Sequence, residues 1–161
     1  MKKILTLGLA LALSLTALAG CTKGGQKTVD VNLEEFYQTI FTDPDNTPAM
    51  MPLEAEMLES FYPGLAEVEL KQTVAYMPMI TAVACEIVMV ECANASDVDA
   101  VKTIFQGRVD SQVENHFNYP MVIEAWENEA QVVANGNYVA LFVVSGMTDE
   151  VVTNFNAACE G

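Results

Sequence analysis

Basic residues are scarce in this chain of 161 residues, which has 7 lysines and arginines against 22 aspartates and glutamates, a formal net charge of −15. A protein that follows the phosphate backbone of a nucleic acid needs a surplus of lysine and arginine on one face. The composition therefore excludes a nucleic-acid binder of that kind. The length predicts one domain.

Recognisable reaction motifs are also lacking. The sequence holds no G-x-G-x-x-G or G-x-x-x-x-G-K phosphate loop, no G-x-S-x-G turn and no H-E-x-x-H helix. Its four cysteines form no C-x-x-C pair, so neither a zinc ribbon nor a thioredoxin-like redox centre is indicated. We therefore expect no cofactor, no metal centre and no catalytic residue.

The N-terminus has the layout of a secretory signal. Lys2 and Lys3 precede an uncharged, mostly apolar segment at residues 4–19, and the tetrapeptide LAGC follows at residues 18–21. The apolar segment is shorter than the about 20 residues that a membrane-spanning helix needs. An ordinary signal peptide, cut at a small-residue site, is the alternative interpretation.

The tetrapeptide LAGC resembles the lipobox of bacterial lipoproteins. In that class a diacylglycerol is attached to the cysteine thiol, and the chain is then cut just before the cysteine. The resemblance implies that residues 1–20 are a lipoprotein signal peptide and that Cys21 is the lipid-attachment residue. It also implies that the chain is lipid-anchored to the cell membrane on its extracytoplasmic face.

Charge is distributed unevenly along the rest of the chain. Residues 21–31 include Lys23 and Lys27 and are expected to form a flexible basic tether, which anionic lipid attracts. Residues 32–161 are expected to form a single acidic domain. From residue 28 onward there are 22 acidic residues against 3 basic ones, a net charge of −19. Such acidity keeps a surface protein soluble.

Helical and strand-like patterns alternate along the body. Apolar residues at helical spacing predict helices, which we place at residues 33–41, 54–61, 97–117, 121–128 and 148–158. Apolar and β-branched runs predict strands, which we place at residues 67–76, 83–92, 130–134 and 138–145. This order predicts an α+β fold, in which a largely antiparallel sheet of about four strands carries helices packed on one face.

Local signals set several boundaries of these elements. Asn32, Ser96 and Thr148 are expected to cap the helices that follow them, because their side chains can accept hydrogen bonds from the first helical amides. Residues 42–52 contain three prolines and are expected to form a loop. The sequence Asn-Gly-Asn at residues 135–137 predicts a hairpin turn.

Three cysteines remain if Cys21 carries lipid. Cys85 and Cys92 lie seven residues apart in one expected strand, which puts them on opposite faces and excludes a disulfide between them. A disulfide of either one with Cys159 stays open, and the alternative is that they are small buried apolar residues. Glu86 and Glu91 lie in the same strand with opposite parity, so we expect one to face outward and the other to lie near a strand end.

The single histidine, His116, is a candidate base if the protein is an enzyme. It would then act on a nucleophile such as Cys85, Cys92 or Ser111. The alternative is that His116 lies near the end of the long expected helix, where an imidazolium would interact favourably with the helix dipole.

A cluster of oxygen ligands makes calcium the one metal with a candidate site. Asp43, Asp45 and Asn46 lie together in the proline-rich loop, but this loop lacks the glycine and the closing glutamate of an EF-hand. The alternative is a turn in which these side chains bond to their own backbone.

The chain as a whole resembles an uncharacterised family of small Gram-positive bacterial lipoproteins, known only as a domain of unknown function. The resemblance covers roughly residues 33–158. It is carried by the lipobox, FYPGL at residues 61–65, CEIVMVE at residues 85–91, the long helix with Arg108, and GNYVALFVVS at residues 136–145. It implies anchorage and fold, and it adds no catalytic or binding residue.

These observations predict a membrane-anchored extracytoplasmic lipoprotein that is a non-enzymatic binding or accessory module. Its partners would be the membrane, through the lipid anchor, and a cationic or protein partner, or a small ligand, on the acidic face or sheet edge. The alternatives are an enzyme with an unrecognised Cys/His site and a small solute- or metal-binding lipoprotein.

Overall fold

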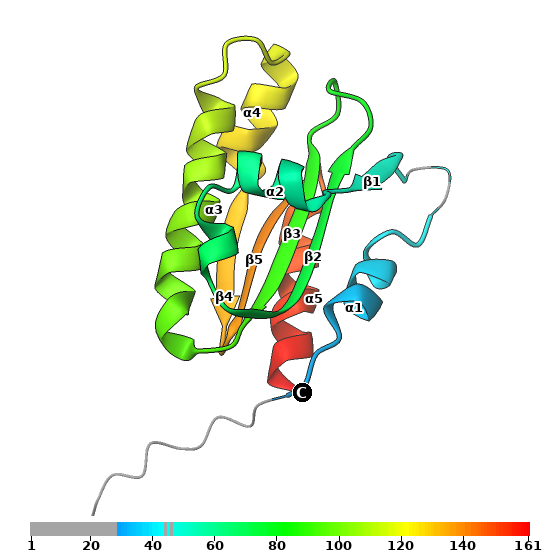
Figure 1. Ribbon diagram of the computed structural model, residues 1–161. Helices are drawn as coiled ribbons and strands as arrows, with labels where there is room; N and C mark the ends of the chain where they lie inside the picture. Colours follow the sequence, from blue (N-terminus) through cyan, green and yellow to red (C-terminus); the bar gives the residue numbers. More distant parts are fainter. Residues whose placement is uncertain (1–28, 44, 46) are drawn as a thin grey trace, which may run out of the picture.

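The computed structural model describes residues 29–161 except 44 and 46. In this part of the chain, five helices pack on an antiparallel sheet of five strands (Figure 1). The α+β class and the antiparallel sheet are therefore confirmed. The expected signal peptide, Cys21 and the tether up to residue 28 lie outside the described residues.

The sheet has the strand order β1-β2-β3-β5-β4, and each strand is antiparallel to its neighbours. The strands are β1 (Met50–Pro52), β2 (Leu70–Pro78), β3 (Cys85–Cys92), β4 (Gln131–Asn135) and β5 (Tyr138–Val144). The three residues of β1 fall within the segment that was expected to be a loop. They form an edge strand, where the proline at residue 52 is tolerated.

The helices fall close to their expected positions. They are α1 (Leu33–Ile40), α2 (Ala55–Phe61), α3 (Val98–Val113), α4 (Pro120–Glu129) and α5 (Thr148–Glu160). Short 3₁₀ turns at Leu65–Glu67 and Ala95–Asp97 precede β2 and α3. The long helix ends at residue 113 rather than at residue 117.

Helices cover both faces of the sheet, so the expectation of one covered face was wrong. α2, α3 and α4 pack on one face, here called the α2–α4 face, and α1 and α5 pack on the other, the α1/α5 face (Figure 1). The reason lies in the two central strands, β3 and β5, in which every residue is buried. Because successive residues of a strand point to opposite faces, full burial requires cover on both sides.

Three phenylalanines lie at the centre of the α1/α5 face. Phe36 comes from α1, Phe142 from β5 and Phe155 from α5. The ring of Phe155 lies edge-on to both others, with centroid distances of 5.6 Å to Phe36 and 5.4 Å to Phe142. The first and the last helix of the described chain therefore meet over the same strand.

Only one of the three expected helix caps is present. Asn32 Oδ1 accepts hydrogen bonds from the backbone amides of Glu34 and Glu35, each at 3.1 Å, as predicted. The prediction for Ser96 was wrong, because Ser96 lies in the 3₁₀ turn before α3 and its hydroxyl bonds to Asp97 Oδ1 at 3.2 Å. That for Thr148 was also wrong: Thr148 is the first residue of α5, and its hydroxyl instead bonds to the backbone of β5.

The hairpin between β4 and β5 is present as predicted. Asn135 pairs with Tyr138, which leaves a two-residue turn. Gly136 occupies its first position with a φ of +58°, a conformation that glycine adopts without strain.

The last residues of the expected tether are bonded to the folded body. The backbone amide of Val31 donates to Tyr138 Oη at 3.0 Å, and that hydroxyl donates to the carbonyl of Val29 at 3.2 Å. Gln72 Nε2 donates to the carbonyl of Val31 at 2.8 Å. Val31 is buried because its apolar side chain packs among residues of the α1/α5 face.

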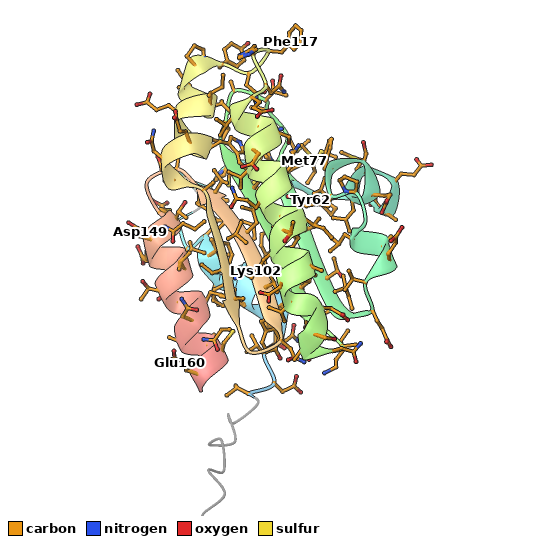
Figure 2. All side chains as sticks on the ribbon, turned by 90° about the vertical axis from the view of Figure 1, so that its left-hand side faces the viewer. Tyr62, Met77, Lys102, Phe117, Asp149 and Glu160 are labelled. Atoms are coloured by element: carbon orange, nitrogen blue, oxygen red, sulfur yellow. The ribbon has the colours of Figure 1, made fainter. Side chains whose placement is uncertain are left out.

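The chain ends and the α3–α4 connection lie at opposite ends of the molecule. The first described residues and the C-terminus lie side by side at one end (Figure 1). The connection between α3 and α4 lies at the opposite end, where Figure 2 places Phe117 far from Glu160. The β2–β3 hairpin extends to this same end (Figure 1).

Candidate functional site

The principal candidate site is a buried ion pair between β3 and α3. Glu86 and Arg108 are only 2% and 8% exposed. Arg108 binds the carboxylate with two parallel hydrogen bonds, Nε to Oε1 at 2.9 Å and Nη2 to Oε2 at 2.7 Å. The hydroxyl of Tyr62, the residue directly after α2, donates to Glu86 Oε1. The three side chains thus connect α2, β3 and α3.

Aromatic rings surround the guanidinium group of Arg108. Its central carbon lies 4.5 Å from the ring centroid of Phe61, 5.6 Å from that of Trp126 and 5.9 Å from that of Tyr62. A guanidinium is weakly hydrated and binds favourably to aromatic faces, so it tolerates this environment better than an ammonium group would. The rings come from α2 and α4, which adds a fourth element to the cluster.

The protonation states follow from this environment. Burial, followed by the adjacent charge of Glu86, raises the pKa of Tyr62 well above its usual value, so its hydroxyl stays a donor. Burial lowers the pKa of Arg108, but the hydrogen bonds and charge of Glu86 outweigh it and raise the pKa overall. Among the described residues, no buried side-chain nitrogen or oxygen lacks a hydrogen-bond partner. This pairing favours a structural role for the cluster.

Two cavities approach the ion pair from different sides. One of about 370 Å³ lies between the end of α2 and α3, and Phe61, Ile104, Arg108 and Ser111 help to line it. A smaller one of about 80 Å³ lies between the β2–β3 hairpin and α3–α4, with Glu86 and Arg108 in its wall.

A second buried carboxylate lies near the other end of β3. Glu91 accepts hydrogen bonds at 2.8 Å from both Lys71 Nζ and Gln72 Nε2. Burial raises the pKa of Glu91, but these hydrogen bonds and the charge of Lys71 lower it overall. Glu91 lies near a strand end as expected, whereas the expectation that the other glutamate faces outward was wrong. Glu86 is buried because Arg108 supplies its partner.

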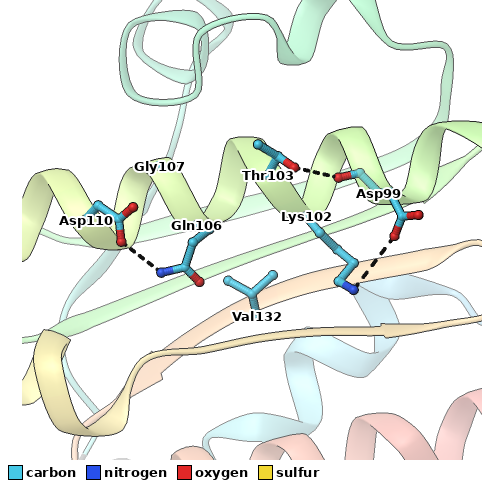
Figure 3. Close-up of a pocket in the computed structure, with 7 residues that line it drawn as sticks. All are labelled: Asp99, Lys102, Thr103, Gln106, Gly107, Asp110 and Val132. Carbon is cyan, nitrogen blue, oxygen red and sulfur yellow. Dashed lines mark hydrogen bonds and ion pairs between the residues drawn. The ribbon is translucent and has the colours of Figure 1, made fainter.

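A surface hollow of about 630 Å³ lies between α3 and β4 (Figure 3). Its polar side chains bind neighbours on their own helix. Lys102 Nζ lies 3.8 Å from Asp99 Oδ1, and Gln106 Nε2 donates to Asp110 Oδ1 at 2.9 Å. These are ordinary helix-surface pairs, so the hollow presents no group positioned for chemistry.

The three cysteines after residue 28 are free and buried. Cys85 belongs to the α1/α5 face and Cys92 to the α2–α4 face, which confirms that they lie on opposite sides of the sheet. Neither one is bonded to Cys159. Burial, followed by the charge of an adjacent glutamate, raises the pKa of Cys85 to about 12 and that of Cys159 to about 11. Thiolates, the nucleophilic form, are therefore disfavoured at neutral pH.

His116 lies in an exposed turn beyond α3 and not within the helix. Among the described residues, no hydrogen bond joins it to Cys85, Cys92 or Ser111. The hydroxyl of Ser111 donates instead to the carbonyl of Arg108 at 2.8 Å. The structure thus does not assemble the base–nucleophile pair that an enzyme of this kind would need.

The calcium candidates are only partly described, because Asn46 lies outside the described residues. Asp43 Oδ1 accepts a hydrogen bond from the backbone amide of Asp45 at 3.0 Å, as in the alternative turn. No group of three or more histidine, cysteine or acidic residues in the described part could hold a metal ion. A site that includes Asn46 stays a prediction.

Sequence reasoning did not pair Glu86 with Arg108 or place Tyr62 beside them. A signal was nevertheless present. Glu86 interrupts an otherwise apolar run, and Arg108 is the only arginine in the chain. A lone carboxylate inside a buried strand needs a buried partner, and arginine is the side chain best suited to a bidentate bond.

Comparison with known proteins identifies a family. A family model described as "Domain of unknown function (DUF4358)" matches residues 43–144, which include all five strands, Glu86 and Arg108. No curated protein and no solved structure matches significantly. Within the described residues, none of the helices has the length and apolar character needed to cross a membrane.

Proposed function

Since this chain belongs to the DUF4358 family, a domain of unknown function, we propose a role from its own residues. It is a lipoprotein that is anchored to the extracytoplasmic face of the cell membrane through Cys21, and its body is a non-enzymatic binding or accessory module. The lipid anchor is proposed from the tetrapeptide LAGC at the end of the uncharged N-terminal segment.

The chemistry between anchor and body supports this arrangement. Val29 is the eighth residue after Cys21, so the anchored end of the body lies within about 29 Å of the lipid-bearing residue. Lys23 and Lys27 lie in this segment, where anionic lipid attracts them. The acidic body is repelled by the same lipid, and this keeps it in solution above the surface.

Two observations support a binding or accessory role over catalysis. The buried ion pair is surrounded by aromatic rings and bonded to a tyrosine hydroxyl, an arrangement typical of a structural cluster. The candidate base His116 is exposed, whereas the candidate thiols of Cys85 and Cys92 are buried and have raised pKa values.

Intact-mass spectrometry of the protein from the membrane fraction tests the proposal. We expect a chain that begins at Cys21 and carries a diacylglyceryl group. The Cys21→Ala variant should keep its signal peptide or appear without lipid. An unlipidated wild-type chain in the medium would refute the anchor. A thiol-blocking reagent applied after unfolding should modify three cysteines, because Cys21 is occupied and the other three are free.

The non-enzymatic part has its own test. If the module only binds, His116→Ala should leave both its stability and its cellular phenotype unchanged, because His116 is exposed in a turn. A phenotype lost while both the free energy of unfolding and the binding of partners stay the same would indicate catalysis. The matched control is Asn154→Ala, an exposed position on α5.

A further inference from the structure

Exposed apolar side chains gather on two loops of the molecule. Five of the six large hydrophobic side chains that are exposed in the described part belong to this set, here called the apolar tip: Phe117 (100% exposed), Met121 (68%), Met79 (64%), Ile80 (59%) and Tyr119 (56%). The first two in chain order follow β2, and the other three lie in the α3–α4 connection and the first turn of α4. Scattered exposed apolar residues are ordinary, whereas a cluster marks an interaction site.

The two loops are adjacent although some forty residues separate them. The cavity of about 80 Å³ lies between them and is lined on one side by Pro78 and Thr81 and on the other by Asn118 and Val122. Its wall reaches Arg108 of the buried ion pair. The cavity is lined by sequence neighbours of the tip residues and by none of the five themselves, so it shows that the two loops lie side by side.

The apolar tip lies at the end of the body away from the anchor. Val29, where the chain enters the described body, packs beside the C-terminus, and Phe117 lies at the opposite end (Figures 1 and 2). On the proposed anchoring, the tip points away from the membrane that holds the chain. A bilayer is thus a poor occupant, and the negative charge of the body disfavours one with anionic lipid.

The net negative charge of the body favours a positively charged partner over a second copy of the chain. The described body has three cations, and each is paired with an acid, namely Lys71 with Glu91, Lys102 with Asp99 and Arg108 with Glu86. Residues 79–84 include no acidic or basic residue, and residues 114–119 include one acid, Glu114, and no lysine or arginine. A second copy would bring another net charge of −19 towards the first. A positively charged partner is attracted instead, with a faster encounter.

We propose that the apolar tip docks a basic protein segment with an exposed apolar face, presented by a partner protein on the extracytoplasmic side. The apolar face of that segment covers the five tip residues, and its lysines and arginines are attracted by the net charge of −19 on the body. This inference rests on the proposed anchoring, because anchoring is what directs the tip away from the membrane.

Site-specific photo-crosslinking in the intact producing cells tests the inference. Benzoylphenylalanine is placed at Phe117, at Ile80 and, as a matched control, at the exposed α5 position Asn154. We expect the first two positions to crosslink to the same partner protein, and the control not to. Sequencing of the crosslinked peptide should show an excess of lysine and arginine together with apolar residues.

Substitutions at the tip give a second measurement on the full-length chain. Met79→Ser together with Met121→Ser should lower the adduct yield at Phe117 by at least about tenfold, because two exposed apolar contacts are lost. Folding should be unaffected, since both side chains are largely in solvent. An unchanged yield would overturn the inference.

Four crosslinking results would also overturn it: adducts with a second copy, adducts with lipid alone, equal adducts at Asn154, or a partner segment that is acidic or uncharged. The mass of the chain in the same membrane preparation separates the two proposals. A lipidated chain without tip-specific adducts refutes the docking surface only. A chain without lipid refutes the anchoring, whatever it crosslinks to.

Discussion

The ion pair between Glu86 and Arg108 allows a quantitative test of the fold. Arg108→Met keeps the length and apolar character of the side chain but removes both hydrogen bonds to Glu86. The carboxylate, 2% exposed, would keep only the hydroxyl of Tyr62 as a partner. Removing one member of a buried pair costs about 3–5 kcal/mol, because the other charge is left without compensation. This is a large part of the about 5–15 kcal/mol by which a domain is stable.

A matched control lies on the same helix. Lys102→Met also removes one positive charge from α3, but Lys102 and Asp99 are both exposed and 3.8 Å apart. We expect a loss of less than about 1 kcal/mol there. Because the two variants have the same net charge, the difference between them isolates the buried contact from the general effect of charge on this acidic body.

The assay is urea-induced unfolding of the purified protein, followed by circular dichroism, with the slope of the transition checked for each variant. Glu86→Leu should lower the free energy of unfolding by a similar amount, since it leaves Arg108 without its carboxylate partner among apolar and aromatic groups. The double variant Glu86→Leu/Arg108→Met should lose clearly less than the sum of the two single losses, because neither charge is then left alone. A cost of Arg108→Met within about 1 kcal/mol of that of Lys102→Met would refute the reasoning.

Three further predictions concern other parts of the molecule. The pKa of Glu91 is lowered in the folded state, so its contribution to stability is present above the unfolded pKa of about 4.3 and is lost as the pH falls through the folded pKa. Glu91→Gln should therefore flatten the acid side of a plot of unfolding free energy against pH, and an unchanged slope would contradict this. Cys85, with a pKa of about 12, should react with Ellman's reagent at pH 8 at least about a hundredfold more slowly in the folded protein than in urea; equal rates would show that the thiol is accessible. Gly107→Ala should stabilise the protein by about 0.5–1 kcal/mol, because a Cβ there meets no atom within 4 Å. Gly136→Ala should destabilise the protein, because the φ of Gly136 is +58°. Thermal unfolding compares the two variants, and a change of the same sign in both would be inconsistent with these conformations.

Elements with a strong local pattern could be predicted from the sequence. α1 has both an apolar face and the side chain of Asn32 to begin it, and these act within a few residues of each other. The hairpin at Gly136 is local in the same sense. β1 could not be predicted because its three residues include Pro52, and they become a strand only by pairing with β2.

The cover on both faces of the sheet depends on contacts that are distant in sequence. Each residue of β3 and β5 is buried, and the apolar character at both parities indicates this in retrospect. The ion pair of the candidate site depends even more on contacts that are distant in sequence. Glu86 and Arg108 are 22 residues apart, on a strand and on a helix, so no periodic pattern brings them together. Only the need of a buried carboxylate for a cation connects them.

The meeting of Phe36 and Phe155 over Phe142 has a consequence for the time at which the chain can fold. α1 is the first helix of the described chain and α5 the last, and both are needed to cover the same face of β3 and β5. Until the thirteen residues of α5 have been synthesised, that face cannot be closed. The core on this face therefore depends on contacts between helices that lie more than a hundred residues apart in sequence, and such long-range contacts form late in folding.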